Sequence, residues 1–427
     1  MLEKKRIIVV GTTADYVELL DARFPERVLF ITDPHERKNW NGVHPKRENE
    51  VICQLDDYDA VSAALNYHIQ SHSFQFNGIV CFDCESMRLT ARLAESNGLV
   101  FPSEQAVLRC RSKYSSKKIW LEKGVPCPNC DLVRHEEDAL KFFDSSSGNP
   151  VVFKPLTGSG SELVFLCTDR QCCSQAYHCI QEHLENHPNK RMYGAESIGE
   201  DLSHQNAVAV EDYIGGEEFS CDFSLENNEV TIIRLSKKIP YKESCFGTIL
   251  AYQMVTHLPN GFEEETLCGY LKDAAQSLGI DRTLAMVDFK IDRGRLYFLE
   301  LTPRPGGDCL PPLIEMSCGF DIFQAALDFA EGKKFNVPSR KEWEPLVGLQ
   351  LFASQAGIIQ KLDVDFLFKD QRVVTHYLKR QEGDRVRLPP EDYDSRSLGW
   401  VIFKPSGKKT IEAECAEIVK NFDIEIG

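Results

Sequence analysis

The 427-residue sequence predicts a mixed α/β and α+β fold. Three observations lead to this class. Strand-like and helix-like segments alternate through the first hundred residues, as in parallel sheets with helices on both faces. Residues 207–240 contain consecutive antiparallel strand patterns. Residues 335–427 combine short strand-like pieces with one final helix, which is typical of a small α+β unit.

The first hundred residues predict a Rossmann-like arrangement. Apolar strand patterns occupy residues 6–10, 27–33 and 77–85, with helical patterns at 59–72 and 87–99. No GxGxxG motif follows the first strand, so this region is not expected to bind a dinucleotide. Its carboxyl edge could line a substrate cleft or could simply form turns.

Bulk composition excludes several functional classes. Hydrophobic residues make up 42% and charged residues 27% of the chain, as in ordinary globular proteins. The net charge of −16 argues against non-specific nucleic-acid binding, which needs a basic surface. No segment approaches the ~18 uninterrupted apolar residues of a membrane span. The N-terminus lacks the apolar stretch of a signal peptide, and we therefore expect a cytoplasmic protein.

The sixteen cysteines are expected to be free thiols, because no export signal precedes them. Two CxxC pairs occur, Cys81–Cys84 and Cys127–Cys130. Their separation does not fit a zinc ribbon, and the second pair encloses a proline in a predicted turn.

Residues 105–125 predict one cationic helix that stops at Gly124, followed by an extended linker. Residues 149–162 then read as a strand with Lys154 near its end and a loop of glycines and hydroxyl residues, 157–161. We call this loop the phosphate loop, because glycines let backbone N–H groups approach an anion closely. The alternative is a surface hairpin turn with a solvated lysine.

Two carboxylates on one predicted hairpin are the most informative feature. Asp288 and Glu300 lie in alternating apolar and polar segments separated by Arg293-Gly294-Arg295. A three-residue loop would place the two acids opposite each other on one face. Facing carboxylates repel each other unless a cation lies between them, and Mg²⁺ prefers such oxygen ligands. The alternative is two solvated surface acids.

The order of these segments resembles the ATP-grasp superfamily, in its carboxylate–amine (amino-acid) ligase branch. The matching motifs are RSKYSSKKIWLEKGVPCP, PVVFKPLTGSGS, VEDYIGGEEFSCD and MVDFKID…LYFLELTPRPGG, in that order. Each motif alone is weak, but together they extend over nearly the whole chain.

The resemblance implies a phosphate-binding set around two lysines. Lys113 corresponds to the first nucleotide lysine and Lys154 to the second. Compact ammonium groups suit phosphate oxygens. The phosphate loop would fold over the phosphates with the following residues: Thr157, Gly158, Ser159, Gly160 and Ser161.

The resemblance also implies an adenosine site in VEDYIGGEE. The backbone of Asp212 and Ile214 would hydrogen-bond adenine, with Glu211 directed toward its amino group. Glu218 would accept from the ribose hydroxyls, although an exposed strand acid is the simpler reading of that residue.

The same resemblance assigns the metal site to Asp288, Glu300 and Thr302. Glu300 would bridge two Mg²⁺ ions, with Mn²⁺ as a substitute. The family usually carries asparagine where this chain has Thr302, whose hydroxyl has a shorter reach. The second ion site is therefore left open.

Substrate contacts are assigned to PRPGGD. Arg304 would hold the acyl phosphate and then the tetrahedral intermediate. Gly306 and Gly307 would offer backbone N–H groups to a carboxylate or phosphate, and Asp308 would grip an amine. Residues 245–259 are expected to face the substrate, and their apolar character suggests a partly hydrophobic pocket.

The resemblance divides the chain into four domains. These are a Rossmann-like pre-ATP-grasp domain (1–108), a small ATP-grasp lobe (109–205), a large ATP-grasp lobe (206–333) and a C-terminal α+β cap (334–427). A homodimer through the first and last domains is one open alternative for the assembly.

The implied activity is an ATP-dependent ligase with small-molecule carboxylate and amine substrates. It would form an amide or peptide bond through an acyl phosphate, releasing ADP and phosphate. A biotin-carboxylase-like or other carboxylating enzyme is the second reading. A degenerate, non-catalytic ATP-binding protein is the third, and only Thr302 supports it.

Overall fold

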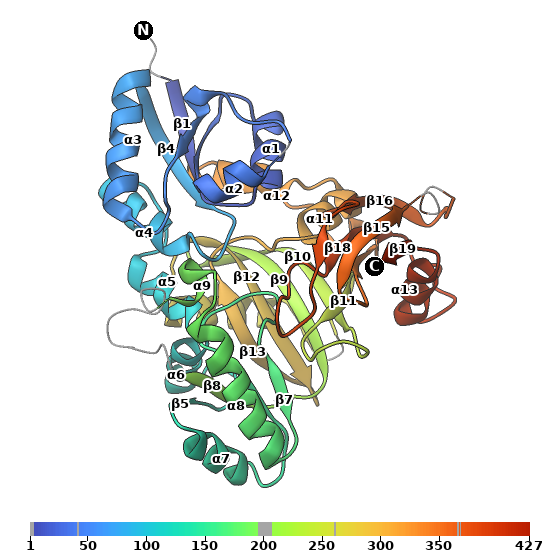
Figure 1. Cartoon of the computed structure of the whole chain (residues 1–427). Helices are drawn as coiled ribbons and strands as arrows, with labels where there is room; N and C mark the ends of the chain where they lie inside the picture. Colours follow the sequence, from blue (N-terminus) through green and yellow to red (C-terminus); the bar gives the residue numbers. More distant parts are fainter. Residues whose placement is uncertain (1–3, 41, 195–206, 260–261, 365–366, 368) are drawn as a thin grey trace.

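The computed structural model describes residues 4–40, 42–194, 207–259, 262–364, 367 and 369–427. Its N-terminal part confirms the predicted Rossmann-like sheet. Four parallel strands lie in the order β3-β2-β1-β4, with α1 to α4 around them (Figure 1). The bounds are β1 Lys4–Val10, α1 Ala14–Arg23, β2 Val28–Thr32, α2 Pro34–Asn39, β3 Glu50–Ile52, α3 Tyr58–His72, β4 Phe74–Cys81 and α4 Met87–Ser96.

The single cationic helix predicted at 105–125 is two helices, so that prediction was wrong. α5 (Glu104–Arg111) ends at Ser112, whose extended backbone breaks the helical path. The Ser112 side chain then accepts a hydrogen bond from the N–H of Ser115 and caps α6 (Lys113–Lys123). Gly124 ends α6 in the left-handed conformation, as predicted. Because of this break, Lys113 is the first residue of α6 and lies near the candidate nucleotide site.

The next segment forms a small antiparallel lobe, coloured teal and green in Figure 1. Its four strands have the order β5-β8-β6-β7, and α7 and α8 pack together against them. The expected linker after Gly124 thus contributes a strand, β5. The bounds are β5 Cys130–Val133, α7 Glu136–Ser145, β6 Val151–Pro155, β7 Phe165–Cys167, α8 Arg170–Glu185, α9 Lys190–Tyr193 and β8 Val208–Asp212.

The centre of the molecule is an eight-stranded antiparallel sheet, ordered β13-β12-β9-β10-β11-β14-β18-β16. It packs on α10 in the main core, and the N-terminal unit joins this core through contacts with α12. The bounds are β9 Glu217–Glu226, β10 Glu229–Pro240, β11 Ile249–Met254, α10 Glu264–Ser277, β12 Thr283–Asp292, β13 Arg295–Thr302, α11 Leu310–Cys318, α12 Ile322–Ala330, β14 Val347–Phe352, β16 Val373–Leu378 and β18 Ser397–Phe403.

Strands from the C-terminal region extend this sheet, because β14 pairs with β11. A further three-stranded sheet, β17-β15-β19, and α13 lie beside it. The bounds are β15 Gly357–Asp363, β17 Arg385–Val386, α13 Ile411–Lys420 and β19 Asp423–Ile426. The four domain boundaries stay predictions. Among the described residues, no helix has both the length and the apolarity that a membrane crossing needs.

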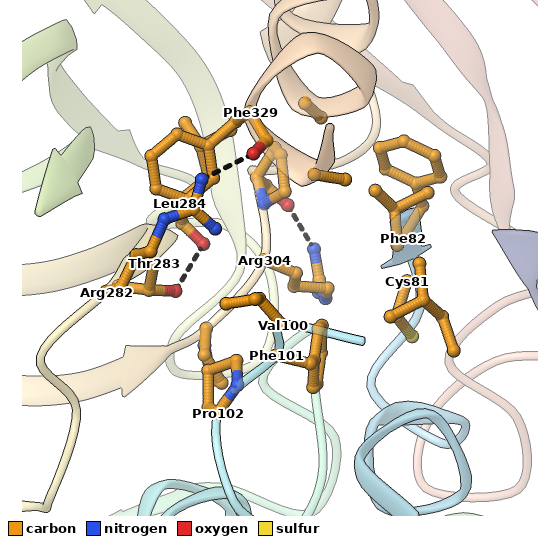
Figure 2. A pocket seen from close by; sticks show the side chains of 16 residues that line it. Cys81, Phe82, Val100, Phe101, Pro102, Arg282, Thr283, Leu284, Arg304 and Phe329 are labelled. Atoms are coloured by element: carbon orange, nitrogen blue, oxygen red, sulfur yellow. Dashed lines mark hydrogen bonds between the residues drawn. The ribbon is translucent and has the colours of Figure 1, made fainter. Parts of the chain in front are cut away.

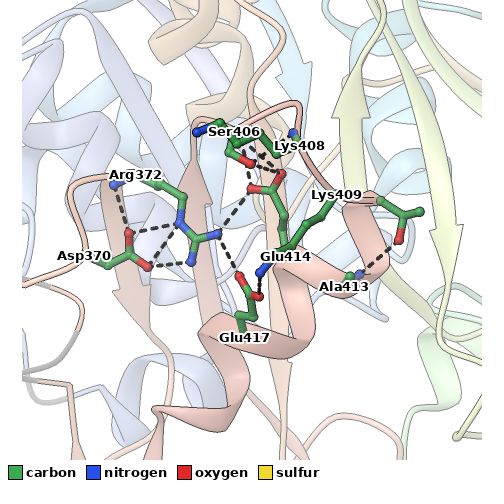
Figure 3. Close-up of polar contacts among 9 residues, drawn as sticks. Asp370, Arg372, Ser406, Lys408, Lys409, Ala413, Glu414 and Glu417 are labelled. Carbon is green, nitrogen blue, oxygen red and sulfur yellow. Dashed lines mark hydrogen bonds and ion pairs between the residues drawn. The ribbon is translucent and has the colours of Figure 1, made fainter.

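A charge cluster around the buried Glu414 fixes α13 to the start of β16 (Figure 3). Arg372 binds Asp370, Glu414 and Glu417. The Glu414 side chain is fully buried and also accepts from the N–H of Ser406 at 2.9 and 3.0 Å. All five residues belong to the C-terminal region, so the cluster stabilises that region from within.

Candidate functional site

Asp288 and Glu300 are paired residues on adjacent strands, as the sequence predicted. The route to this pairing differs from the prediction. The hairpin loop has two residues, Arg293 and Gly294, both with positive φ. The register then shifts between Phe289 and Asp288, which leaves Leu299 as the extra residue of a β-bulge.

The bulge decides which side chain faces Asp288. In an uninterrupted ladder, Asp288 would pair with Leu299, and Glu300 would pair with Val287 on the other face. With the bulge, Leu301 pairs with Val287 in the core instead, and both are almost fully buried. The two carboxylates therefore share the polar face.

Polar side chains form cross-strand rows on this face. The row through Asp288 contains Glu300 and Ser220. The neighbouring row runs across four strands and consists of Lys290, Glu218, Lys238 and Tyr252. Paired residues point to the same side of a sheet, so acids and lysines alternate over one surface.

Lys238 lies between two of these acids. Its Nζ is 2.7 Å from Asp288 Oδ2 and 2.6 Å from Glu218 Oε1. Burial alone would lower the pKa of Lys238, but the two carboxylates outweigh burial and raise that pKa well above its ordinary value. Burial raises the pKa of Asp288; Lys238 opposes this effect and Glu300 adds to it.

Asp288 keeps one oxygen for another ligand. Its Oδ1 is buried and has no hydrogen-bond partner among the described residues. Such an atom is costly unless something binds it. The Glu300 carboxylate lies 3.8 Å from Lys113 Nζ. Two carboxylates with an unmatched oxygen fit Mg²⁺, which uses one or two protein carboxylates and completes its shell with phosphate oxygens and water.

No group of three potential His, Cys, Asp or Glu ligands occurs within the described ranges. The pair would therefore depend on the nucleotide for further ligands. Thr302 lies on the same face as Glu300, two residues along β13 and opposite Met286. All sixteen cysteines are free, as predicted.

A second buried cluster links both lobes. Glu211 on β8 receives a hydrogen bond from Lys154 on β6, and its other oxygen lies 3.0 Å from Lys117 Nζ. Burial would raise the pKa of Glu211, but the two lysines hold it below its ordinary value. Burial lowers the pKa of Lys154 to about 8. Lys117 also donates to the bulge carbonyl of Leu299 at 2.6 Å.

The phosphate loop lies close to the first lysine. Lys113 Nζ donates to the carbonyl of Gly158 at 2.9 Å. Gly158, Gly160 and Ser161 have positive φ, a conformation that glycine adopts without strain. Thr157 is buried and donates to the carbonyl of Met192, so its hydroxyl is a structural contact in this conformation.

The adenosine candidates follow β8. The N–H of Asp212 donates to the carbonyl of Asn129 at 3.0 Å. The carbonyl of Ile214 accepts from Lys290 Nζ at 2.9 Å, and Lys290 also lies 4.9 Å from the ring centre of Tyr213. These contacts engage the N–H of Asp212 and the carbonyl of Ile214.

The candidate substrate residues follow β13. Arg304 turns toward the N-terminal unit, where its Nη2 is 3.0 Å and its Nε 3.3 Å from Cys84 Sγ. Figure 2 shows Arg304 at the side of a mainly apolar pocket, near Cys81 and Val100. Cys84 raises the pKa of Arg304 against the effect of burial. The Arg304 guanidinium is thus charged and faces the junction between two units.

The two loop glycines differ. The N–H of Gly306 donates to Asp222 Oδ1 at 2.8 Å, so this predicted anion donor already has a protein acceptor. Gly307 lies nearer the N-terminal unit, where a Cβ would be 3.9 Å from the Tyr16 hydroxyl. Asp308 is exposed and has positive φ.

Four site residues were missed by sequence reasoning: Lys117, Lys238, Asp222 and Arg234. Arg234 is fully buried and binds Asp222 at 2.6 Å, and Asp222 in turn holds Gly306. For Asp222, Arg234 and Lys238 the available signal was a charged residue inside an otherwise apolar strand, because such residues are rarely buried without a partner. Lys117 lies on α6 and had no such signal.

Comparison with known proteins agrees with this geometry. Residues 147–312 match the ATP-grasp domain family. This chain contains an ATP-grasp domain. The matched segment runs from β6 through the phosphate loop and the carboxylate hairpin to α11.

Two proteins similar to this chain bear ligase and synthase names. Dapdiamide A synthase of Enterobacter agglomerans is 23% identical over 209 residues, which cover 49% of this chain and 46% of that protein. This chain thus matches about half the length of that relative. D-alanine–D-alanine ligase of Acidovorax ebreus (strain TPSY) is 24% identical over 251 residues, covering 54% of this chain and 68% of that protein.

The fold extends across the whole chain. The crystal structure of an L-amino acid ligase from Bacillus licheniformis superposes with a TM-score of 0.75 and 18% identity, covering 100% of both chains. The predicted class, with a Rossmann-like unit, two ATP-grasp lobes and a C-terminal α+β part, is therefore confirmed.

Proposed function

We propose that this chain is an ATP-dependent ligase that joins a carboxylate to an amine. The observation that carries the proposal is the Asp288–Glu300 pair, which shares one polar face with Lys238 and keeps Asp288 Oδ1 unmatched. The named relatives support the ligase class.

In this proposal, adenosine binds between β8 and the polar face. The carbonyl of Asp212 and the N–H of Ile214 contact adenine near Glu211. Glu218 releases Lys238 in part and accepts from the ribose. Lys113, Lys154 and the phosphate loop hold the phosphates, because ammonium groups and exposed N–H groups both suit their oxygens.

Asp288, Glu300 and Thr302 would hold Mg²⁺, with Mn²⁺ as a substitute, and Glu300 would also serve a second ion if one binds. When bound, the metal neutralises triphosphate charge during phosphoryl transfer. The substrate carboxylate attacks the γ-phosphorus, and ADP leaves. The amine then attacks the carbonyl carbon of the acyl phosphate, and phosphate departs as the amide forms.

Arg304 is the cation for the acyl phosphate and the tetrahedral oxyanion. Its charge is held at the junction with the N-terminal unit, where a carboxylate substrate can enter. Gly307 is the loop glycine that remains for an anion contact, and Asp308 is exposed to bind the amine.

A screen of amino-acid pairs tests the function. Phosphate release and the mass of the product are measured for the unmodified chain and for Glu300→Gln. We expect ADP, phosphate and an amide for at least one pair, only with the unmodified chain. Bicarbonate-dependent turnover without an amine would indicate carboxylation instead. Tight MgATP binding without turnover on any pair would indicate a non-catalytic ATP-binding protein.

A further inference from the structure

Arg396 is a buried arginine without an acidic partner. It lies immediately before β18 and is 6% exposed. No carboxylate within the described part of the chain forms an ion pair with it. Its Nη1 donates to Ser244 Oγ at 2.7 Å and its Nη2 to Thr248 Oγ1 at 2.9 Å. A buried guanidinium is normally paired with an acid, so this arrangement requires a reason.

The partners of Arg396, Ser244 and Thr248, belong to one loop, residues 241–248, which joins β10 to β11. We call it the bridging loop. The aromatic ring of Phe352 lies 5.0 Å from the guanidinium and Tyr393 lies 5.8 Å away. The backbone of Arg396 is fixed as well, because its carbonyl accepts from the N–H of Ala353. A rigid part of the C-terminal region thus holds the bridging loop.

Two residues of the bridging loop, Phe246 and Gly247, contact both sides of the proposed nucleotide site. Phe246 packs edge-on against Tyr213, with ring centres 6.1 Å apart, beside the adenosine candidates. The carbonyl of Gly247 accepts from Ser161 Oγ of the phosphate loop at 2.8 Å. Gly247 has φ +85°, and a Cβ there would lie 2.8 Å from the Ser161 Cβ.

We propose that Arg396 is a positioning residue for nucleotide binding, which holds the bridging loop so that Phe246 and Gly247 fix Tyr213 and the phosphate loop. This inference rests on the proposed function. The inference adds to the proposed function a role for the C-terminal region in the nucleotide site. Arg396 itself touches neither nucleotide nor substrate. The five N–H donors of one guanidinium form a planar fork that can hold two hydroxyls at once.

The expected effect concerns the population of the binding-competent loop. If Arg396→Ala frees the bridging loop, only a fraction of molecules present an ordered phosphate loop, and the apparent Kd for MgATP rises by that factor. We expect a rise of about ten-fold, with kcat at saturating ATP changed much less. Arg396→Lys restores part of the affinity, because an ammonium group can still donate to Ser244 and Thr248.

The experiment measures MgATP binding by calorimetry and amide hydrogen exchange of residues 157–161 and 241–248. Arg396→Ala and Gly247→Ala, which disturb opposite ends of the same chain of contacts, should both weaken binding and speed exchange in the phosphate loop. Arg372→Ala is the matched control, since it removes another arginine whose partners all lie within the C-terminal region. It should lower Tm and leave MgATP affinity unchanged.

The inference is overturned, and the ligase proposal is left intact, by one result. In that result Arg396→Ala lowers Tm but changes neither MgATP affinity nor amide exchange in the phosphate loop. An unmodified chain that fails to bind MgATP would overturn both. An unmodified chain that binds MgATP but ligates no pair overturns the ligase chemistry alone, and the affinity comparison still decides the role of Arg396.

Discussion

Asp288 stands opposite Glu300 across the β12–β13 hairpin, on the polar face of the central sheet. The bulge at Leu299 produces this register, and the buried Lys117 holds the bulge by binding its carbonyl. The placement of the acid pair therefore depends on a lysine that is distant in sequence and lies on α6 rather than on the sheet.

Glu300→Gln should nearly abolish ADP release. The amide keeps the shape of the side chain but removes the charge that a metal ion needs. Steady-state ADP release at saturating ATP measures the effect, with far-ultraviolet circular dichroism as the check that the fold persists. A variant with normal turnover would remove the metal site from the mechanism.

Arg304→Ala should separate binding from chemistry. We expect MgATP affinity to stay near that of the unmodified chain while the rate falls by roughly 10²–10³, as when an oxyanion donor is lost. Calorimetry and single-turnover kinetics give the two quantities. An equal loss in both would make Arg304 a nucleotide contact.

Lys117→Ala should destabilise the protein by about 3 kcal/mol, because it leaves Glu211 and the Leu299 carbonyl with fewer partners in a buried site. Urea unfolding measures this free energy. The neighbouring Lys118 is exposed and supplies the control. Lys118→Ala should stay within about 0.5 kcal/mol of the unmodified chain. Similar losses for both variants would contradict the linking role of Lys117.

Glu414 should make stability depend on pH. Burial would raise the pKa of Glu414, but hydrogen bonds from Ser406 and Arg372 lower it below the ordinary 4.5. The folded state therefore binds this proton less readily than the unfolded state. The stabilisation is complete above about pH 4.5 and is lost as pH falls through the lowered pKa.

The comparison variant is Glu414→Gln, which cannot ionise. We expect its stability deficit, about 2 kcal/mol at pH 7, to shrink below pH 4.5. Chemical denaturation from pH 7 to pH 3.5 gives the curves. Glu412 is exposed on the same helix, and Glu412→Gln should follow the unmodified chain at every pH. A deficit for Glu414→Gln that does not change with pH would contradict the assignment.

Sequence patterns located helices and strands more reliably than the residues at which they begin and end. The helix α8, Arg170–Glu185, has a weak helical pattern in the sequence, because its cysteines and histidines interrupt the apolar stripe. At the start of α8, the Asp169 side chain accepts a hydrogen bond from the N–H of Cys172. This capping residue was the sequence signal for the helix. The break at Ser112 had a similar capping residue inside an apparently continuous helical pattern.

Local pattern alone determined the alternating α/β start, the glycine-rich loop and the carboxylate hairpin, because period-two alternation and glycine placement act over a few residues. Only the tertiary structure decided that Leu299 bulges, that Lys117 and Lys238 sit beside the acids, and that Arg396 reaches the loop between β10 and β11. Those relationships join residues up to 182 positions apart. Their energies arise from burial and charge pairing, which exist only once the strands and lobes have assembled.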